Sequence, residues 1–439
     1  MKSLDRIPTS KIERAGQLVH TGVKLGGNYM KYYGKKLLNP ELEKETLDQE
    51  NARDIYDGLK NLKGSALKVA QMLSMEKNLL PRAFVERFSL AQFSVPPLSG
   101  PLVRKTFRTY FGCYPEELYD HFEPESINAA SIGQVHRARK DGKALAVKIQ
   151  YPGVSESIRS DLALVKPVAM RMFNLKARDT QKYFQEVEDK LGEETDYLLE
   201  LRQSRAITEA CQILDGIRFP GYYPDWSCER ILTMDWMEGT HLGDFTKLNF
   251  DPDSGNRLGQ SLWDFYMYQI HQLRKVHADP HPGNFLVGPD GMLIAIDFGC
   301  IKEIPDSFYE PYFELARQAT FSDDKAFTRK LYELEILTEE DSQEEISFFK
   351  SLFREMLELF TRPFNQQEFD FASPEFWARI TELSQRYSND PKIRKMNASR
   401  GSRHFLYMNR TFFGLYNLLF DLKARVQVYN FEKYLDKVA

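Results

Sequence analysis

The chain has 439 residues, of which 42% are hydrophobic and 13% aromatic, so it can build sizeable buried cores and wholesale disorder is excluded. Its 59 lysines and arginines against 63 aspartates and glutamates give a formal charge of −4. Dedicated nucleic-acid binders usually carry a basic excess, so this balance argues against that class. The cysteines lie far apart and form no CxxC pair, which favours reduced thiols in the cytosol over a zinc site or a disulfide scaffold. They are Cys113, Cys211, Cys228 and Cys300.

No stretch of the sequence approaches the roughly 18 uncharged apolar residues that a membrane-spanning helix needs. The longest candidate late in the chain, residues 411–420, is bounded by Arg410 and Asp421. The first residues also lack the compact apolar core of a signal peptide. We therefore expect a cytoplasmic protein that is at most peripheral to a membrane surface.

The first 36 residues form a basic arm. They hold eight lysines and arginines against two acidic residues, a local charge of +6, and their five glycines interrupt any helix. The arm is either a solvated segment or a surface that contacts anionic lipid, where each basic residue can add about 1 kcal/mol.

A helical extension follows the arm. Lys68 and Gln71 lie opposite its apolar face, and a second helix is predicted after Pro81, ending before the Pro96-Pro97 pair. We therefore expect the arm and the extension to occupy residues 1–98. The apolar residues of the first helix fall on one stripe at 100° per residue: Ile55, Leu59, Leu62, Ala66, Val69, Ala70 and Leu73.

A small mixed segment comes next, and a mainly helical region follows it. Strands are predicted at 135–139 and 144–149, joined by a turn at 140–143, and again at 230–236. Helices are predicted over most of 155–215, over 256–276 and throughout the chain after Pro305, with a hairpin at 286–296. This order predicts an α+β, two-lobed, protein-kinase-like fold with an N-lobe at 99–237 and a C-lobe at 238–439.

The strongest motif is HADPHPGN at residues 277–284, followed by Asp297-Phe298-Gly299. Kinase catalytic loops place an aspartate two residues after a histidine, an asparagine five residues further on, and an Asp-Phe-Gly sequence downstream. One carboxylate and one amide oxygen, from Asp297 and Asn284, are hard ligands suited to Mg²⁺. A separate carboxylate, Asp279, would then position the group that attacks the phosphate.

An alternative is a hydrolytic zinc site built from His277, Asp279 and His281. It would leave Asn284 and Asp297 without a role. In the kinase-like interpretation, His277 is a structural residue that holds the loop.

Lys148 ends the second strand of the 135–149 hairpin in the sequence LAVK, which is typical of the strand that carries the ATP lysine. The segment before that hairpin, Ala129 to Gly133, would then lie over the phosphates. Ordinary kinases have G-x-G-x-x-G here, whereas this chain has Ala129, Ala130 and Ser131 and keeps only Gly133.

These residues together resemble the UbiB/AarF family of atypical kinase-like proteins. The resemblance rests on AASIGQVH at 129–136, DPHPGN at 279–284 and DFG at 297–299, and it extends from about residue 62 to about residue 305. It implies a kinase-like fold whose N-terminal extension packs over the active cleft. It also implies ATP and Mg²⁺ as cofactors, and a link to isoprenoid quinone biosynthesis or lipid homeostasis.

The resemblance also assigns residues that composition would not single out. The family's K-x-G-Q motif matches Lys68 to Gln71, with Ala70 in place of its glycine. Its E-x-D motif matches Glu194 and Asp196, and Glu200 matches the glutamate that pairs with the ATP lysine. By analogy with the hinge between kinase lobes, the backbone from Asp235 to Met237 would meet the adenine.

We therefore expect an atypical kinase-like ATPase or phosphotransferase with ATP, and an anionic or quinone-pathway lipid or enzyme, as its partners. One alternative is a true protein or small-molecule kinase. Another is a nucleotide-gated lipid-binding scaffold with negligible turnover.

Overall fold

The computed structural model describes residues 44–62, 97–129, 132–172, 177–248, 250–388 and 400–428, with six single positions before residue 37. The chain divides into two compact units. Unit 1 comprises Met1–Arg202 and Gly221–Trp236, and unit 2 comprises Gln203–Pro220 and Met237–Ala439. The last passage of the chain from unit 1 to unit 2 therefore falls between Trp236 and Met237.

Unit 1 is built on an antiparallel sheet in the order β1-β3-β4-β6, with β2 paired to the start of β3. A tight turn at Asp141-Gly142 joins β3 to β4, and its φ angles of 49° and 75° are the positive pair that a type I′ hairpin turn requires. The predicted hairpin and the predicted strand at 230–236 are confirmed. The strands are β1 (His121–Phe122), β2 (Asn128–Ala129), β3 (Gly133–Lys140), β4 (Lys143–Gln150) and β6 (Ile231–Asp235).

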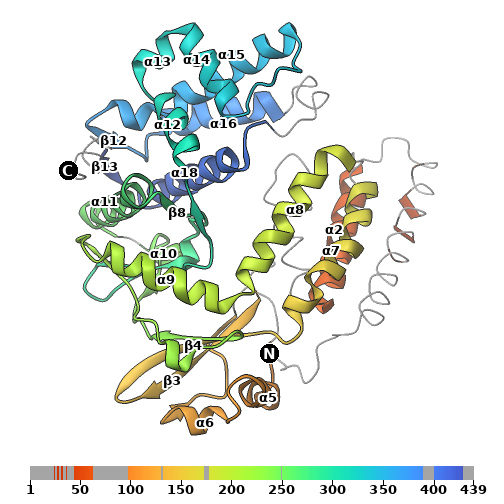
Figure 1. Cartoon of the computed structure of the whole chain (residues 1–439), viewed down its shortest axis with the longest axis vertical. Coiled ribbons are helices and arrows are strands. Elements are labelled where there is room, and N and C mark those ends of the chain that lie inside the picture. Colours follow the sequence, from red (N-terminus) through yellow and green to blue (C-terminus); the bar gives the residue numbers. More distant parts are fainter. Residues whose placement is uncertain are drawn as a thin grey trace. The chain divides into compact units, whose positions relative to one another are not determined.

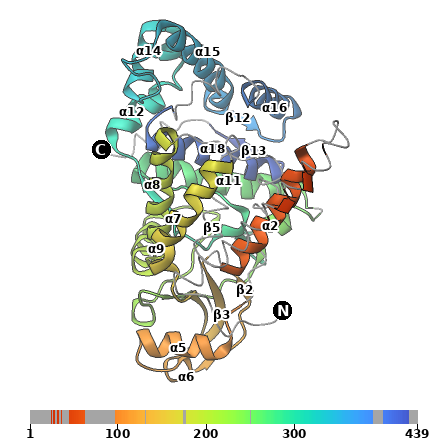
Figure 2. The same ribbon diagram turned by 90° about the vertical axis from the view of Figure 1, so that its right-hand side faces the viewer.

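Six helices of unit 1 are described. Both Figure 1 and Figure 2 show α5 and α6 beside β3, and the Phe107 ring of α5 packs against the ring of Phe122 at 5.5 Å between centroids. The α7–α8 pair is antiparallel, since Arg159 Nε lies 2.9 Å from Glu188 Oε1. The helices are α2 (Lys44–Leu62), α5 (Gly100–Tyr110), α6 (Pro115–Leu118), α7 (Val154–Met172), α8 (Ala177–Glu194) and α9 (Tyr197–Cys211), which ends in unit 2.

In the N-terminal extension, α2 begins at Lys44, before Ile55, the first residue of the predicted apolar stripe. Leu47, Ala52 and Tyr56 are buried and Ile55 is half-buried, so the buried side chains lie on both sides of the predicted stripe. Residues 63–96 of the extension, which include the predicted helix after Pro81, lie outside the described residues.

Unit 2 contains a four-stranded sheet in the order β5-β10-β9-β7 and two small two-stranded sheets, β8-β11 and β12-β13. The predicted hairpin at 286–296 is confirmed as β9 and β10. The strands are β5 (Ile217–Arg218), β7 (Thr240–His241), β8 (Lys275–His277), β9 (Phe285–Val287), β10 (Leu293–Ala295), β11 (Ile301–Glu303), β12 (Glu368–Asp370) and β13 (Arg425–Gln427).

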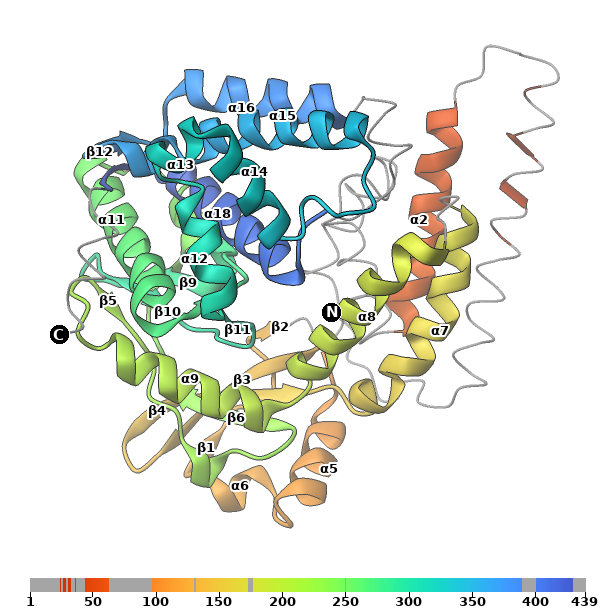
Figure 3. The ribbon, with the colours of Figure 1, turned by 45° about the horizontal axis from the view of Figure 1, so that its top comes forward.

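Helices make up most of the remainder of unit 2. Figure 1 and Figure 3 both show α15 and α16 side by side, and an ion pair between Arg386 and Glu355 joins them. The α-helices are α10 (Leu242–Phe245), α11 (Pro252–Tyr268), α12 (Asp306–Glu314), α13 (Gln318–Ser322), α14 (Asp324–Glu333), α15 (Gln343–Phe360), α16 (Pro374–Ser388) and α18 (Arg403–Asp421). The short helical turns in the described part of the chain are η2 (Pro224–Trp226), η3 (Gln269–Leu273), η4 (Pro282–Asn284) and η5 (Arg362–Asn365).

Two predictions for the C-terminal half are wrong in detail. The predicted helix at 256–276 ends as an α-helix at Tyr268, continues as the π-helical turn η3, and gives way to β8. Arg274, with a φ of 51°, lies in the left-handed region and ends the helical path there. The chain after Pro305 is also not purely helical, because it contains β12 and β13, which pair with each other.

Candidate active site

A buried ion pair lies on the central strand of unit 1. Lys148 sits on β4 between Val135 of β3 and Leu232 of β6. Its Nζ lies 2.7 Å from Glu200 Oε1, and the two residues are only 9% and 4% exposed. Two charges removed from water need each other, because either one alone would carry a large desolvation penalty. The structure thus brings together the lysine and the glutamate that the resemblance pairs.

The E-x-D motif positions Glu200. Asp196 Oδ1 accepts the backbone N–H of Leu199 at 2.9 Å, and the Asp196 carbonyl accepts the N–H of Glu200 at the same distance. Asp196 therefore caps α9, which carries Glu200 in its first turn. Glu194, the last residue of α8, is half-buried.

At Gly133 the backbone packs closely against neighbouring groups. A Cβ at this position would lie 2.4 Å from the carbonyl oxygen of Ile149 and 2.9 Å from the Tyr197 hydroxyl, so a side chain cannot fit without moving backbone. The Lys148 ammonium lies 5.2 Å from the centroid of the same Tyr197 ring. Gly133, Tyr197 and Lys148 therefore share one closely packed region beside the ion pair.

The start of the alanine-rich loop is only partly described. Ala129 ends β2 and pairs with Gln134 of β3, so the loop joins two antiparallel strands. Ala130 and Ser131 lie outside the described residues, as do Lys68 and Gln71 of the K-x-G-Q motif.

The predicted hinge begins at the last residue of β6. The carboxylate of Asp235 accepts hydrogen bonds from the Tyr223 hydroxyl at 2.6 Å and from the Gly221 backbone N–H at 2.7 Å. These bonds occupy the side chain of Asp235, so a contact with adenine at this residue, as predicted from the sequence, would be made by the backbone. Met237, the first residue of unit 2 after the crossing, is half-buried.

In unit 2, the loop after β8 is folded on itself around Asp279. The carbonyl of Asp279 accepts the N–H of His281 at 2.8 Å and the side-chain amide of Asn284 at 2.9 Å. Asp279 is half-buried. Because Asn284 uses its amide nitrogen in this contact, its carbonyl oxygen is the atom with which it would bind a metal ion.

The two predicted metal ligands lie at one end of the β9–β10 hairpin. Asn284 comes directly before β9, and Asp297 follows β10 after one residue, Ile296. The Ile296 N–H donates to the Asn284 carbonyl at 3.0 Å, so the antiparallel ladder extends to this end. Asp297 Oδ1 accepts the N–H of Gly299 at 2.9 Å, a local bond that orients the carboxylate.

This donor set fits Mg²⁺. One carboxylate and one amide oxygen are hard oxygen ligands, and Mg²⁺ usually takes only one or two carboxylates in addition to phosphate oxygens and water. Within the described ranges, no group of three His, Cys, Asp or Glu side chains is arranged to hold a metal ion. The zinc alternative built from His277, Asp279 and His281 therefore gains no support from the described residues.

Residues that the sequence did not single out hold the catalytic loop. His277 is 2% exposed, its backbone N–H donates to Gln269 Oε1 at 2.9 Å, and its ring packs edge-on against Phe298 at 5.9 Å. His277 is thus structural, as expected. On α18, a Cβ at Gly414 would lie 2.3 Å from Pro280 Cγ, so the missing side chain lets this helix approach the loop. Neither Gln269 nor Gly414 belongs to a motif.

All four cysteines are free thiols, in agreement with the sequence analysis. Burial raises the pKa of the Cys211 thiol to about 12, which keeps it protonated and unreactive at neutral pH. None of the helices in the described part of the chain combines the length and the apolar character that spanning a bilayer requires.

Comparison with known proteins identifies the family. Residues 90–331 match the model of the ABC1 atypical kinase-like domain. An aarF domain-containing protein kinase of Arabidopsis thaliana, chloroplastic, is 27% identical over 72% of this chain and 45% of its own length. The mitochondrial atypical kinase COQ8 of Saccharomyces cerevisiae is 28% identical over 77% of this chain and 68% of its own length.

The chain spans about half the length of several curated relatives that it matches. Among solved structures, Rv3197 from Mycobacterium tuberculosis, in a complex with erythromycin, has a TM-score of 0.60 at 24% identity. That match covers 90% of this chain and 97% of the other and supports the fold. Since the domain match covers more than half of the chain, the protein belongs to the ABC1, or UbiB/AarF, family of atypical kinase-like proteins and has its α+β fold.

Proposed function

We propose that this protein binds ATP together with Mg²⁺ and hydrolyses or transfers the γ-phosphate. The buried ion pair between Lys148 and Glu200 carries the proposal. A buried pair of this kind is often no more stable than apolar packing, so its presence favours a functional explanation. In kinase-like chemistry this lysine neutralises the α- and β-phosphates and the glutamate holds it in place.

The other roles follow from the motifs. Asp279 would position the attacking water or hydroxyl, while Asn284 and Asp297 would hold Mg²⁺, which bridges phosphate oxygens and offsets their charge. The backbone from Asp235 to Met237 would meet the adenine. The loop residues Ala129, Ala130, Ser131 and Gly133 would cover the phosphates, and Lys68, Gln71, Glu194 and Asp196 would shape the nucleotide site.

We place this activity in isoprenoid quinone biosynthesis or membrane lipid homeostasis, on the strength of the family resemblance. A true protein or small-molecule kinase remains the alternative with the same fold, and a phosphorylated product in place of free phosphate would favour it. A lipid-binding scaffold that uses ATP only as a switch would bind the nucleotide, yet its turnover would not depend on Asp279.

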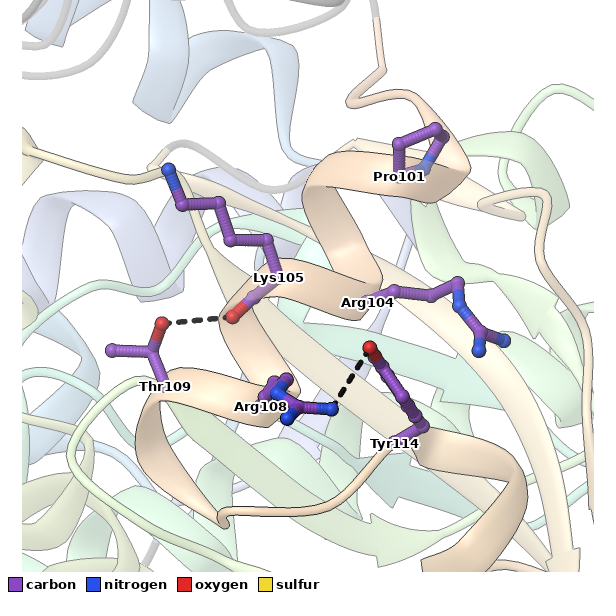
Figure 4. Close-up of a pocket in the computed structure, with 6 residues that line it drawn as sticks. All are labelled: Pro101, Arg104, Lys105, Arg108, Thr109 and Tyr114. Atoms are coloured by element: carbon purple, nitrogen blue, oxygen red, sulfur yellow. Dashed lines mark hydrogen bonds between the residues drawn. The ribbon is translucent and has the colours of Figure 1, made fainter.

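A basic pocket on α5 favours an anionic partner. Its volume is about 490 Å³, and Figure 4 shows Arg104, Lys105 and Arg108 projecting from the same helix. Arg104 pairs with Glu116, and Arg108 donates to the Tyr114 hydroxyl at 3.0 Å. Among the described residues, none of the side chains that line the pocket is acidic. We propose that this surface, together with the basic arm that lies mostly outside the described residues, contacts the phosphate groups of anionic lipids.

Thermal unfolding with and without Mg-ATP tests the nucleotide proposal. A ligand at 100 times its dissociation constant adds about 2.7 kcal/mol to the free energy of unfolding. The melting temperature should therefore rise by roughly 5–10 °C. The rise should require Mg²⁺ and should shrink in Asp297→Ala. An equal rise in the variant, or none in the parent, would contradict the assignment.

A further inference from the structure

Three consecutive hydrogen bonds run through the interior of unit 1 beside the alanine-rich loop. The N–H of Leu98 donates to Gln134 Oε1 at 2.6 Å, Gln134 Nε2 lies 2.7 Å from His136 Nε2, and His136 Nδ1 lies 2.9 Å from the carbonyl oxygen of Glu123. Gln134 and His136 are both fully buried, and Leu98 is 3% exposed. The bonds link three segments: the end of the N-terminal extension, the first half of β3, and the residue after β1.

The groups at the two ends of this series of hydrogen bonds determine which atom is the donor and which the acceptor in each bond. A backbone N–H can only donate, so Gln134 must turn its carbonyl oxygen toward Leu98 and its amide toward His136. His136 Nε2 must then accept, which requires a ring without a proton on that nitrogen. The Glu123 carbonyl can only accept, so the proton of the neutral ring lies on Nδ1. All polar atoms in the series are thereby satisfied with one tautomer.

We propose that Gln134 and His136 are positioning residues that hold the strand of the alanine-rich loop in register with the end of the N-terminal extension. Gln134 pairs directly with Ala129 across the loop, and the neighbouring Gly133 is the residue that packs against Ile149 and Tyr197. Any shift of Leu98 would therefore reach the loop through a single side chain. Their effect on nucleotide binding rests on the proposed function, whereas the hydrogen-bond chain itself does not.

The surroundings of the imidazole are consistent with a neutral ring. The Phe122 ring stacks on His136 with centroids 5.0 Å apart, and burial lowers the pKa of His136 below its usual 6.5. The charge of Glu123, together with its backbone hydrogen bond, acts in the opposite direction, and burial outweighs both. Protonation of Nε2 would place two donors face to face, with Gln134 unable to turn without losing Leu98.

Nuclear magnetic resonance of the histidine side chains in the full-length protein tests the chain of bonds directly. His136, assigned by its loss in His136→Gln, should be neutral with its proton on Nδ1 at neutral pH. The isosteric Gln134→Glu replaces the amide donor by an acceptor, so His136 must become the donor. Its pKa should then rise, because the introduced carboxylate favours the protonated ring. An unchanged protonation state of His136 in Gln134→Glu would overturn the proposal.

Amide hydrogen exchange provides a second measurement that needs no nucleotide. Gln134→Ala removes the acceptor of Leu98, and exchange of that N–H should become about tenfold faster. Gln212→Ala, which changes an exposed glutamine, is the matched control and should leave exchange at Leu98 unaltered. Equal exchange in Gln134→Ala and the parent would contradict the link between extension and strand.

The positioning role predicts that Gln134→Ala raises the KM for Mg-ATP more than it lowers kcat, and that Gln134→Glu restores part of the loss. If Gln134→Ala has the KM of the parent but faster exchange at Leu98, the hydrogen bonds stand and the positioning role is contradicted. If the parent binds no Mg-ATP, the proposed function fails. The NMR and hydrogen-exchange measurements would still show whether the three hydrogen bonds exist.

Discussion

Lys148 and Glu200 depend on each other because both are buried. Removing one partner from a buried pair leaves the other charge without compensation, at a cost of about 3–5 kcal/mol. Lys148→Met and Glu200→Leu should each lose stability of this order in urea unfolding. The double variant, which buries neither charge, should recover most of it.

The stability that the double variant regains measures the coupling between Lys148 and Glu200. If the two single losses simply add in the double variant, the two side chains are not coupled and the 2.7 Å contact has no energetic meaning. Nucleotide binding should be lost in all three variants, since each removes a group that the proposed function needs.

Buried histidines make stability sensitive to acid. Burial lowers the pKa of His271 to about 3, and its Nδ1 lies 2.6 Å from the Tyr309 hydroxyl. The unfolded chain takes up a proton near pH 6.5 and the folded chain does not, so the unfolded state binds more protons below that pH. Stability therefore falls as the pH drops. His271 alone should contribute a loss of about 1 kcal/mol between about pH 7.5 and 5.5.

Urea unfolding of the parent and of His271→Gln at both pH values checks this expectation. The variant cannot titrate at this position, so its stability should fall less than that of the parent over the same interval. Identical pH dependence of parent and variant would show that His271 is not responsible.

Residues in motifs could be predicted from the sequence, and their supporting contacts could not. Lys148, Asp279, Asn284 and Asp297 stand at the spacings of kinase motifs, which is why the sequence singled them out. Gln269 belongs to no motif and acts through an ordinary buried hydrogen bond to the backbone of His277. Gln134 lies within the AASIGQVH motif, but the motif does not reveal its hydrogen bond to Leu98. A glutamine leaves no pattern in the sequence that distinguishes this use from a solvated side chain.

At the scale of elements, the contact of α18 with the catalytic loop predicts an effect from outside every motif. Gly414→Leu places a side chain where Pro280 already lies, so it should push the loop or the helix away. We expect a loss of about 1–3 kcal/mol in urea unfolding, as for other overpacked sites. The rate of ATP turnover in Gly414→Leu should fall by more than the loss of folded protein accounts for.

Gly192→Ala is the matched control for Gly414→Leu. Gly192 lies on α8, and a Cβ added there would meet no atom within 4 Å, so alanine should stabilise the protein by about 0.5–1 kcal/mol. If Gly414→Leu were as stable and active as the parent, the close approach of α18 would be unimportant.

Long alternating strands and tight turns were predictable elements, as β3, β4 and their Asp141-Gly142 turn show. The end of α11 was not, because its helical periodicity continues through Gln269–Leu273 while the backbone changes to a π-helical turn and then to β8. β12 and β13 have three residues each, too few for a recognisable alternation, and they exist because they pair with each other.

At the scale of the whole molecule, the proposed lipid contact predicts salt-sensitive attachment to anionic vesicles. Lys105→Gln with Arg108→Gln removes two cations of the α5 pocket, each worth about 1 kcal/mol at such a surface, so binding should weaken by roughly tenfold or more. Co-sedimentation with anionic and neutral vesicles at low and high salt measures it.

Lys325→Gln with Arg329→Gln on α14 is the control, because it removes the same charge from exposed positions at a comparable spacing. Deletion of residues 1–36 separates the contribution of the basic arm. If the parent and the α5 variant pellet equally with anionic vesicles, the pocket does not contact lipid. If the parent and the deletion variant pellet equally, the arm does not contact lipid.

The rate at which γ-phosphate leaves ATP tests most directly whether this fold carries out the proposed phosphoryl chemistry. With Mg²⁺ present, the purified full-length protein should convert ATP to ADP and either free phosphate or a phosphorylated product. Asp279→Asn should fold and bind Mg-ATP like the parent while its rate falls by about a hundredfold or more. A rate that is the same in the parent and in Asp279→Asn would contradict the account.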